Sequence, residues 1–175
     1  MLSQEVKLHI KDIPDFPKKG IIFKDITPVF LRPDICKRVV NEMASHFTNE
    51  VDAVAGLESR GFLLGMMLAE VLNVPFIPVR KEGKLPGDKN SKRYCLEYGE
   101  ACIEIQKNVI QPDWNILIHD DLLATGGTAS AASQLIMEEG AHVAGYAFMI
   151  DLAFLHGKEK LKTYSDNIVS IVEYH

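Results

Sequence analysis

The sequence predicts an α/β protein whose central sheet is mostly parallel and flanked by helices. Apolar segments of strand length alternate along the chain with segments that have the length and apolar spacing of helices. Strands that are apolar on both faces are typical of parallel sheets, because helices then cover both sides. The 175 residues, 47% hydrophobic and 25% charged, suit one globular domain over residues 1–175 with a sizeable core.

The N-terminal region is expected to precede the sheet. Residues 3–13 place Val6, Ile10 and Ile13 at helical spacing, which predicts a short surface helix. A loop with prolines and a glycine follows it. Residues 33–47 then predict a longer helix with four apolar side chains on one face. These four are Ile35, Val39, Met43 and Phe47.

The rest of the chain is expected to build the sheet and its covering helices. The expected strands are residues 51–57, 74–80, 115–120, 142–151 and 167–174. Helices are expected over 61–72 and 128–140, the second closed by a glycine. Ligands of such sheets bind beyond the carboxyl ends of the strands. Three polar segments should therefore share one rim, namely 58–61, 80–84 and 120–121.

Residues 81–100 form a long polar connection. The segment contains glycines and is too long for an ordinary link between two elements of a compact domain. We therefore expect a functional flap over the site, mobile when the site is empty.

Charge and cysteine content exclude several classes of function. The net charge of -5 argues against broad binding to nucleic acid, although a local basic pocket could hold a small anion. Cys36, Cys95 and Cys102 are odd in number and lack the spacing of metal ligands, so we expect free thiols in a reducing compartment. The N-terminus is amphipathic and charged, unlike a signal peptide, and no apolar run reaches the ~20 residues of a membrane span. These features predict a soluble, cytoplasmic protein.

The stretch ILIHDDLLATGGTAS, residues 116–130, carries the strongest chemical signal. Asp120 and Asp121 end an apolar strand, where two adjacent carboxylates repel each other and gain nothing from apolar neighbours. The glycine turn after them offers backbone N–H groups at a helix N-terminus, which suits a phosphate, and Thr125 and Thr128 add hydroxyl donors. The carboxylates can accept hydrogen bonds from sugar hydroxyls and lie close to a Mg²⁺ that the same ligand carries. The pattern therefore predicts a sugar phosphate ligand. Ordinary helix-capping aspartates would explain one acid but not the whole string.

The string is neither a Walker loop nor a dinucleotide-binding fingerprint. It resembles the 5-phosphoribosyl-1-pyrophosphate (PRPP) signature of the type I phosphoribosyltransferase family. GLESRGFLLG, VRKEGKLPG, LEYGEACIEIQK and DFPKKGIIFKDITPVF are similar to segments of its adenine phosphoribosyltransferases. The resemblance covers roughly residues 10–174. It implies the fold of that family, with a small N-terminal hood over residues 1–32 that binds the base and the flap at 81–100.

The resemblance also implies a reaction and its participants. The 5-phosphoribosyl group of PRPP would pass to adenine, which forms AMP and diphosphate in purine salvage. Mg²⁺ would be the cofactor, held mainly by PRPP and near Asp120 and Asp121. The protein would be a homodimer with no nucleic-acid or membrane partner.

Individual residues take roles from the same resemblance. The turn for the 5-phosphate matches Ala124, Thr125, Gly126, Gly127 and Thr128, and the acids for the ribose hydroxyls match Asp120 and Asp121. Diphosphate contacts match Ser59, Arg60, Gly61, Arg80, Lys81 and Lys84, and Arg60 would also assist catalysis. A cis peptide bond is implied between Glu58 and Ser59.

The base site is implied by two further segments. Phe23 would stack on adenine, while the backbone of Ile22 and Lys24 reads its edge. Glu97 would donate a proton to the purine, and Tyr98 would shield the site or hold the flap closed.

Alternative interpretations stay open for single residues and for the whole chain. Taken alone, Arg60 fits a surface arginine, Phe23 a core residue, and Glu97 a surface acid. His119 departs from the family, which more often has an apolar residue there, and we favour a core or interface group over a catalytic one. A transferase for a 6-oxopurine, or a non-enzymatic sensor of PRPP, are the rival functions. The segments IIFKDI and LEYG favour adenine, and the length and acidic charge favour an enzyme.

Overall fold

The computed structural model describes residues 1–96 and 99–175, without the side chains of residues 95 and 96. One large sheet runs through the described part of the chain in the order β5-β6-β4-β3-β7-β8-β9. Its strands are β3 (Ala53–Leu57), β4 (Phe76–Lys81), β5 (Lys89–Leu96), β6 (Gly99–Gln106), β7 (Asn115–Leu123), β8 (His142–Leu152) and β9 (Ile168–Tyr174). The pairs among β4, β3, β7, β8 and β9 are parallel, whereas β5 and β6 run antiparallel. The predicted α/β class with a mostly parallel sheet is confirmed.

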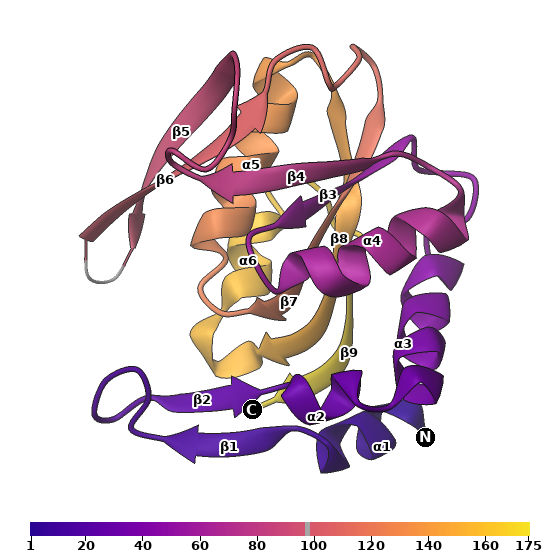
Figure 1. Cartoon of the computed structure of the whole chain (residues 1–175), viewed down its shortest axis with the longest axis vertical. Helices are drawn as coiled ribbons and strands as arrows, with labels where there is room; N and C mark the ends of the chain where they lie inside the picture. The colour runs from indigo at the N-terminus through magenta and orange to yellow at the C-terminus, as the bar shows by residue number, and fades with distance from the viewer. Residues whose placement is uncertain (97–98) are drawn as a thin grey trace.

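Helices cover both faces of this sheet (Figure 1). Helices α3 (Pro33–Ser45) and α4 (Gly61–Leu72) pack on one face, and α5 (Gly127–Glu138) packs on the other. On β7, Leu117 belongs to the first apolar cluster and Ile116 and Ile118 to the second. Because both faces of the central strands are buried, their sequences are apolar without alternation.

The N-terminal region forms a separate small layer at the bottom of Figure 1. It contains α1 (Leu2–Leu8), the antiparallel pair β1 (Lys11–Pro14) and β2 (Ile22–Asp25), and the short helix α2 (Thr27–Phe30). The prediction that Ile13 continues the first helix was wrong, since Ile13 pairs with Phe23 in the hairpin and is 38% exposed. Pro14 explains the change, because a proline disfavours helical backbone in the residue before it.

The connection after β4 is more regular than we expected. Strands β5 and β6 pair from Lys89↔Gln106 to Leu96↔Gly99, so most of the predicted flap is a hairpin that extends the sheet. Strand β4 pairs with β6 only at Arg80↔Glu104 and Lys81↔Ile103. The buried residues Ile103 and Ile105 explain the pairing, because they hold β6 against the second apolar cluster.

The chain ends close to the hood. A short 3-10 turn η1 (Ala153–Leu155) and helix α6 (Gly157–Leu161) connect β8 to β9. Lys7 and Lys24 both place their ammonium groups over the ring of Tyr174 in β9. In the part of the chain that the structure describes, every helix is too short or too polar to cross a membrane.

Candidate active site

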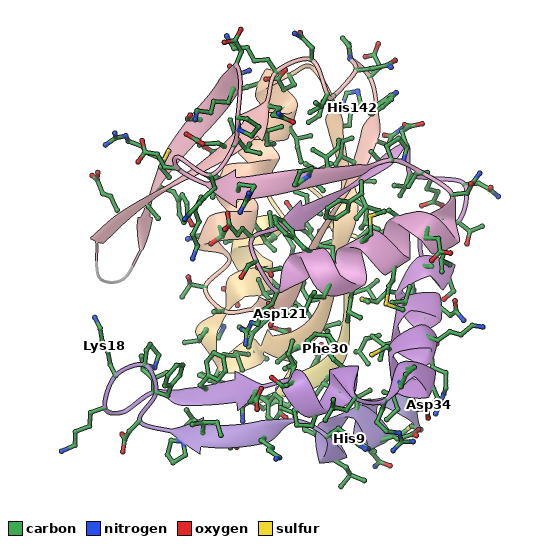
Figure 2. The ribbon with its side chains drawn as sticks, in the orientation of Figure 1. His9, Lys18, Phe30, Asp34, Asp121 and His142 are labelled. Atoms are coloured by element: carbon green, nitrogen blue, oxygen red, sulfur yellow. The ribbon has the colours of Figure 1, made fainter. Side chains whose placement is uncertain are left out.

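Three turns meet at the edge of the sheet where the parallel strands end, here called the carboxyl edge. Strand β3 lies between β4 and β7, so the turns that follow these three strands are neighbours. They carry the segments 58–61, 80–84 and 120–128. Figure 2 shows Asp121 at this edge, close to the first turn of α4. The shared rim that the sequence predicts is therefore confirmed.

The two aspartates at the end of β7 are only partly compensated. Asp121 is buried, and its Oδ2 lies 3.0 Å from Nη2 of Arg60 in an ion pair that lacks hydrogen-bond alignment. Asp120 Oδ1 accepts a hydrogen bond of 2.9 Å from the backbone N–H of Asp121. Burial raises the pKa of Asp120 well above its usual range, and the charge of Asp121 raises it further. Burial also raises the pKa of Asp121, although Arg60 opposes this. The pair therefore gains from a ligand that donates hydrogen bonds or brings positive charge.

Gly61 allows α4 to begin directly against these acids. A Cβ atom at this position would lie 2.9 Å from Asp120 Oδ1 and 3.0 Å from the carbonyl oxygen of His119. Any larger residue would push the first turn of α4 away from β7. The glycine in the ESRG turn is thus required by the close approach of two backbones.

The turn after β3 is tied to the turn after β4 by Glu58. Its carboxylate accepts hydrogen bonds from Arg80 Nε and Nη2, both at 3.2 Å, and from the backbone N–H of Lys81 at 2.8 Å. Arg80 Nη1 also donates to the carbonyl oxygen of Lys84 at 3.0 Å. Burial works to raise the pKa of Glu58, but the contacts with Arg80 and Lys81 outweigh it and lower the pKa. The peptide bond between Glu58 and Ser59 is cis, as expected.

Glu58 is a site residue that was not identified from the sequence. It orients Arg80 and the start of the basic turn, so it acts through the predicted diphosphate contacts. Its only signal in the sequence is an acid at the end of a buried strand, which is also common in ordinary loops.

The GGT turn forms a small cradle after β7. Gly126 has a φ of 74°, and α5 begins at Gly127 without a side-chain cap among the described residues. Residues of the turn line a cavity of about 150 Å³ together with Asp120. Backbone N–H groups at an uncapped helix N-terminus attract anions, so this cradle suits a phosphate.

The hairpin contacts this cradle through Tyr94, a second residue that was not identified from the sequence. The hydroxyl of Tyr94 in β5 lies 3.0 Å from Oγ1 of Thr128. Tyr94 and Thr128 also line a cavity of about 490 Å³ with Glu58, Lys81 and Asp120. The cavity therefore opens onto all three turns of the carboxyl edge and onto the hairpin.

A larger and more apolar cavity, of about 600 Å³, lies between the hood and the carboxyl edge. Its lining includes Ile22, Phe23 and Lys24 from β2, as well as Arg60. The guanidinium carbon of Arg60 lies 4.7 Å from the centroid of the Phe23 ring. Arg60 thus touches the aspartate pair and the aromatic ring at once.

The side chain of Lys24 is held by the hairpin and by β9. Its Nζ donates to Asp12 Oδ1 at 2.6 Å and lies 3.9 Å from the centre of the Tyr174 ring. The contact of the Lys24 backbone with a base stays a prediction.

His119 is a buried core group, as expected. It is 0% exposed, and its Nδ1 lies 2.8 Å from the carbonyl oxygen of Ala147. Burial lowers its pKa to about 4, so the imidazole is neutral at pH 7. Glu97 and Tyr98 lie outside the described residues.

The residues at the carboxyl edge could supply part of the ligand set of a magnesium ion. Within residues 1–96 and 99–175, no three His, Cys, Asp or Glu side chains gather into a metal site. The adjacent carboxylates of Asp120 and Asp121 can supply oxygen ligands, but Mg²⁺ prefers six. The remaining ligands would have to come from phosphate oxygens and water.

Comparisons with known proteins agree with this geometry. Residues 31–174 match the phosphoribosyl transferase domain. The adenine phosphoribosyltransferase of Cytophaga hutchinsonii is 46% identical over 175 residues, which are 99% of this chain and 97% of that protein. The crystal structure of the enzyme of that name from Thermoanaerobacter pseudethanolicus superimposes with a TM-score of 0.94 at 43% identity, and covers 99% of this chain and 100% of its own.

A further solved relative carries a purine-like ligand. The Giardia lamblia enzyme, solved in complex with 9-deazaadenine, has a TM-score of 0.92 and 36% identity, and the match covers 100% of this chain and 99% of that one. The family match spans most of the chain, and the relatives named here are 36–46% identical to it. The chain therefore belongs to the phosphoribosyltransferase family, among the adenine phosphoribosyltransferases.

Proposed function

We propose that this protein transfers the 5-phosphoribosyl group of PRPP to N9 of adenine and releases AMP and diphosphate, a step of purine salvage. The observation that carries the proposal is the position of Arg60. It touches Asp121 on one side and Phe23 on the other, so the acid pair and the apolar cavity are adjacent. Phosphoribosyl transfer needs a sugar phosphate and a purine at such a junction.

The GGT turn would hold the 5-phosphate. The backbone N–H groups from Ala124 to Thr128 and the positive end of the α5 dipole stabilise the dianion, and the hydroxyls of Thr125 and Thr128 donate to it. With the phosphate fixed here, the ribose extends toward the aspartate pair. Its hydroxyls donate to Asp120 and Asp121, which relieves the poor solvation of these buried carboxylates.

The acids also act during the reaction. As the bond between C1 and the diphosphate breaks, the ribose ring gains positive charge, which nearby carboxylates stabilise. Mg²⁺, brought by PRPP and held near Asp120 and Asp121, would supply Lewis-acid stabilisation of the diphosphate.

The leaving diphosphate would lie against the turns after β3 and β4. Arg60, Arg80, Lys81 and Lys84 surround it with positive charge, and the backbone around Ser59 and Gly61 offers N–H donors. Glu58 orients Arg80 for this contact. Fixed charges of this kind stabilise a transition state without the cost of reorganising water.

Adenine would occupy the apolar cavity and stack on Phe23. The Arg60 guanidinium lies over that ring. A purine on the same ring face would displace Arg60, which is then available to the diphosphate. The backbone at Ile22 and Lys24 reads the 6-amino edge. The flap, residues 81–100, would close over the site, with Glu97 as proton donor and Tyr98 as shield.

We also propose a single domain with a base-binding hood over residues 1–32, a cytoplasmic location and a homodimer. Support for the dimer comes from α4, which begins next to Arg60. Leu63, Met66 and Val71 form an apolar stripe along α4 and are 52%, 58% and 48% exposed. A second copy of the chain packed on this stripe would remove it from water.

The test is a base-specificity assay. Purified protein is mixed with PRPP, Mg²⁺ and either adenine or hypoxanthine, and AMP, IMP and diphosphate are quantified. A 6-oxopurine presents an acceptor where the site needs a donor, so we expect discrimination on the order of 10⁴. Equal turnover of the two bases would contradict the assignment of adenine, and the absence of nucleotide from both would contradict the transferase.

A further inference from the structure

A second pair of acids lies at the same carboxyl edge, outside the three cavities at that edge. Asp151 near the end of β8 is paired in register with Glu173 of β9. Lys158, in α6, places its Nζ 3.0 Å from Asp151 Oδ2 and also contacts Glu173 Oε1. Ser170 donates a further hydrogen bond of 3.1 Å to Glu173. We call Asp151, Lys158 and Glu173 the Lys158 bridge.

In this bridge two carboxylates share one ammonium group. Asp151 is 1% exposed, and neither of its carboxylate oxygens has an aligned hydrogen bond within the described residues, so the ammonium group of Lys158 is its ionic partner. Burial works against the charge of Lys158, but its contacts with Glu173 and Asp151 raise its pKa overall. The contact with Lys158 lowers the pKa of Glu173. Because an unpaired buried carboxylate is costly, the bridge holds α6 firmly against the ends of β8 and β9.

The residue before Lys158 touches the GGT turn directly. A Cβ atom on Gly157 would lie 2.3 Å from the carbonyl oxygen of Ala124, and one on Gly126 would lie 2.9 Å from the carbonyl oxygen of Gly157. The two backbones are therefore in contact with no side chain between them. A shift of α6 would be passed directly to the turn.

We propose that the Lys158 bridge positions the phosphate-binding turn. It fixes Gly157 against Ala124 and Gly126, and the turn keeps the shape in which its N–H groups converge on the 5-phosphate. Lys158 is thus a positioning residue that acts through Gly157 and touches no substrate. This inference rests on the proposed function, because it assumes that the turn binds the 5-phosphate.

The test separates the two phosphate sites with two simple ligands. Ribose 5-phosphate probes the GGT turn, and inorganic diphosphate probes the turns after β3 and β4. Binding of each, with Mg²⁺, is measured by calorimetry on wild type, Lys158→Met, Lys158→Arg and the exposed control Lys160→Met. A displacement of about 1 Å in a binding group can cost up to about 10²-fold. We expect Lys158→Met to weaken ribose 5-phosphate binding about tenfold or more, with diphosphate binding within about twofold.

The controls decide between positioning and general stability. Lys158→Arg should restore most of the ribose 5-phosphate affinity, since arginine can span the same two acids, and Lys160→Met should match wild type. An equal loss of affinity for both ligands in Lys158→Met, or no loss of affinity for either, would overturn the inference. If Lys158→Met does not fold, Glu173→Gln weakens one arm of the bridge and should give the same selective loss on a smaller scale. Failure of wild type to bind ribose 5-phosphate would overturn the proposed function, and the inference with it.

Discussion

The carboxyl edge of the sheet carries two pairs of acids, and the chain compensates them differently. In the first pair, Asp121 has an ion-pair contact with Arg60, yet the pKa values of both Asp120 and Asp121 are raised. Asp151 and Glu173 hold Lys158 between them, and the pKa of Glu173 is lowered. Asp120 lines two of the cavities at this edge, whereas Asp121, Asp151 and Glu173 line none of the three.

The difference separates a binding site from a structural brace. A folded protein gains nothing from buried charge that it leaves uncompensated, so such charge points to a ligand that completes it. A lysine shared between two acids instead holds the elements that carry them together. We therefore expect substitutions in the first pair to affect function without loss of stability, and substitutions in the second to reduce stability.

The largest expected effect is on turnover, in Asp120→Asn and Asp121→Asn. Each keeps the shape of the side chain but removes charge that orients the ribose and favours the oxocarbenium-like state. We expect kcat/KM to fall by about 10²-fold or more, the range for loss of one preorganised electrostatic group. Steady-state kinetics with PRPP and adenine check this. Near wild-type turnover in both variants would remove the acids from the mechanism.

The free energy of unfolding of Asp120→Asn should stay the same or rise, although its activity falls. The folded-state pKa of Asp120 is raised, so its ionised form costs stability once the pH exceeds the pKa of the unfolded chain. The ligand-free variant should therefore unfold at the same or a higher temperature than wild type at pH 7. A clearly lower melting temperature would mean that the pair braces the fold after all.

The second effect is a loss of stability in Asp151→Asn. Loss of a buried ion-pair partner costs about 3–5 kcal/mol, and partial exposure of Lys158 should reduce this to about 2–3 kcal/mol. Urea denaturation measures this loss.

The pH dependence of the stability that the bridge contributes has a defined sign. The lowered pKa of Glu173 gives stability that is present above its unfolded pKa and lost as pH falls through the folded one, and the raised pKa of Lys158 gives stability that is lost at alkaline pH.

A substitution next to the acids tests whether proximity alone decides function. His119 precedes Asp120 but is buried and neutral, with its pKa lowered from 6.5 to about 4. The unfolded chain protonates this group first, so wild type should lose about 2 kcal/mol of stability from this residue between pH 7.5 and pH 5. His119→Leu should lack that loss and retain activity within about threefold, since a substitution of similar size keeps the packing. Inactive, folded His119→Leu would show that the imidazole has a role in the reaction.

The smallest effect is expected for Tyr94→Phe. It removes the hydroxyl that contacts Thr128 in the phosphate turn, a single neutral hydrogen bond worth about 1 kcal/mol. We expect KM for PRPP to rise about three- to fivefold with little change in melting temperature. Tyr164→Phe is the matched control, because its hydroxyl contacts Ser130 and Gln134 on the same helix but lies outside the turn. An equal rise in both variants would assign the effect to α5 and not to the turn.

The sequence predicted much of the fold because the central strands are buried on both faces. Continuous apolar runs such as residues 53–57 are typical of strands that helices cover on both sides, and polar turn residues follow these runs where the strands end. The hairpin of β5 and β6 was missed because Lys, Asn, Ser and Arg fill β5, whose stability comes from pairing and not from its own apolar pattern. Ile13 was misplaced because its spacing from Ile10 fits a helix, whereas Pro14 disfavours helical backbone in the residue before it.

The sequence predicted those residues of the candidate site that form a recognisable motif, but not those that orient other residues. The string DDLLATGGT pointed to the acid pair and to the GGT turn, whose phosphate-binding role stays a prediction. Three residues were not identified, because each contacts a residue on another element: Glu58 contacts Arg80, Tyr94 contacts Thr128, and Lys158 contacts Glu173. These contacts become apparent only when the strands and helices are placed in space.

The charge of Asp120 and Asp121 is only partly compensated, and we expect a bound ligand to complete it. The most direct measurement is thermal unfolding of wild type and of the double variant Asp120→Asn/Asp121→Asn, with and without PRPP and Mg²⁺. A ligand present at about 100 times its Kd stabilises the folded state by about 2.7 kcal/mol, which raises the melting temperature of wild type by several degrees. We predict that the ligand-free double variant melts at or above the wild-type temperature and shows little or no shift with PRPP. A double variant that melts lower than wild type and is still stabilised by PRPP to the full extent would contradict this assignment.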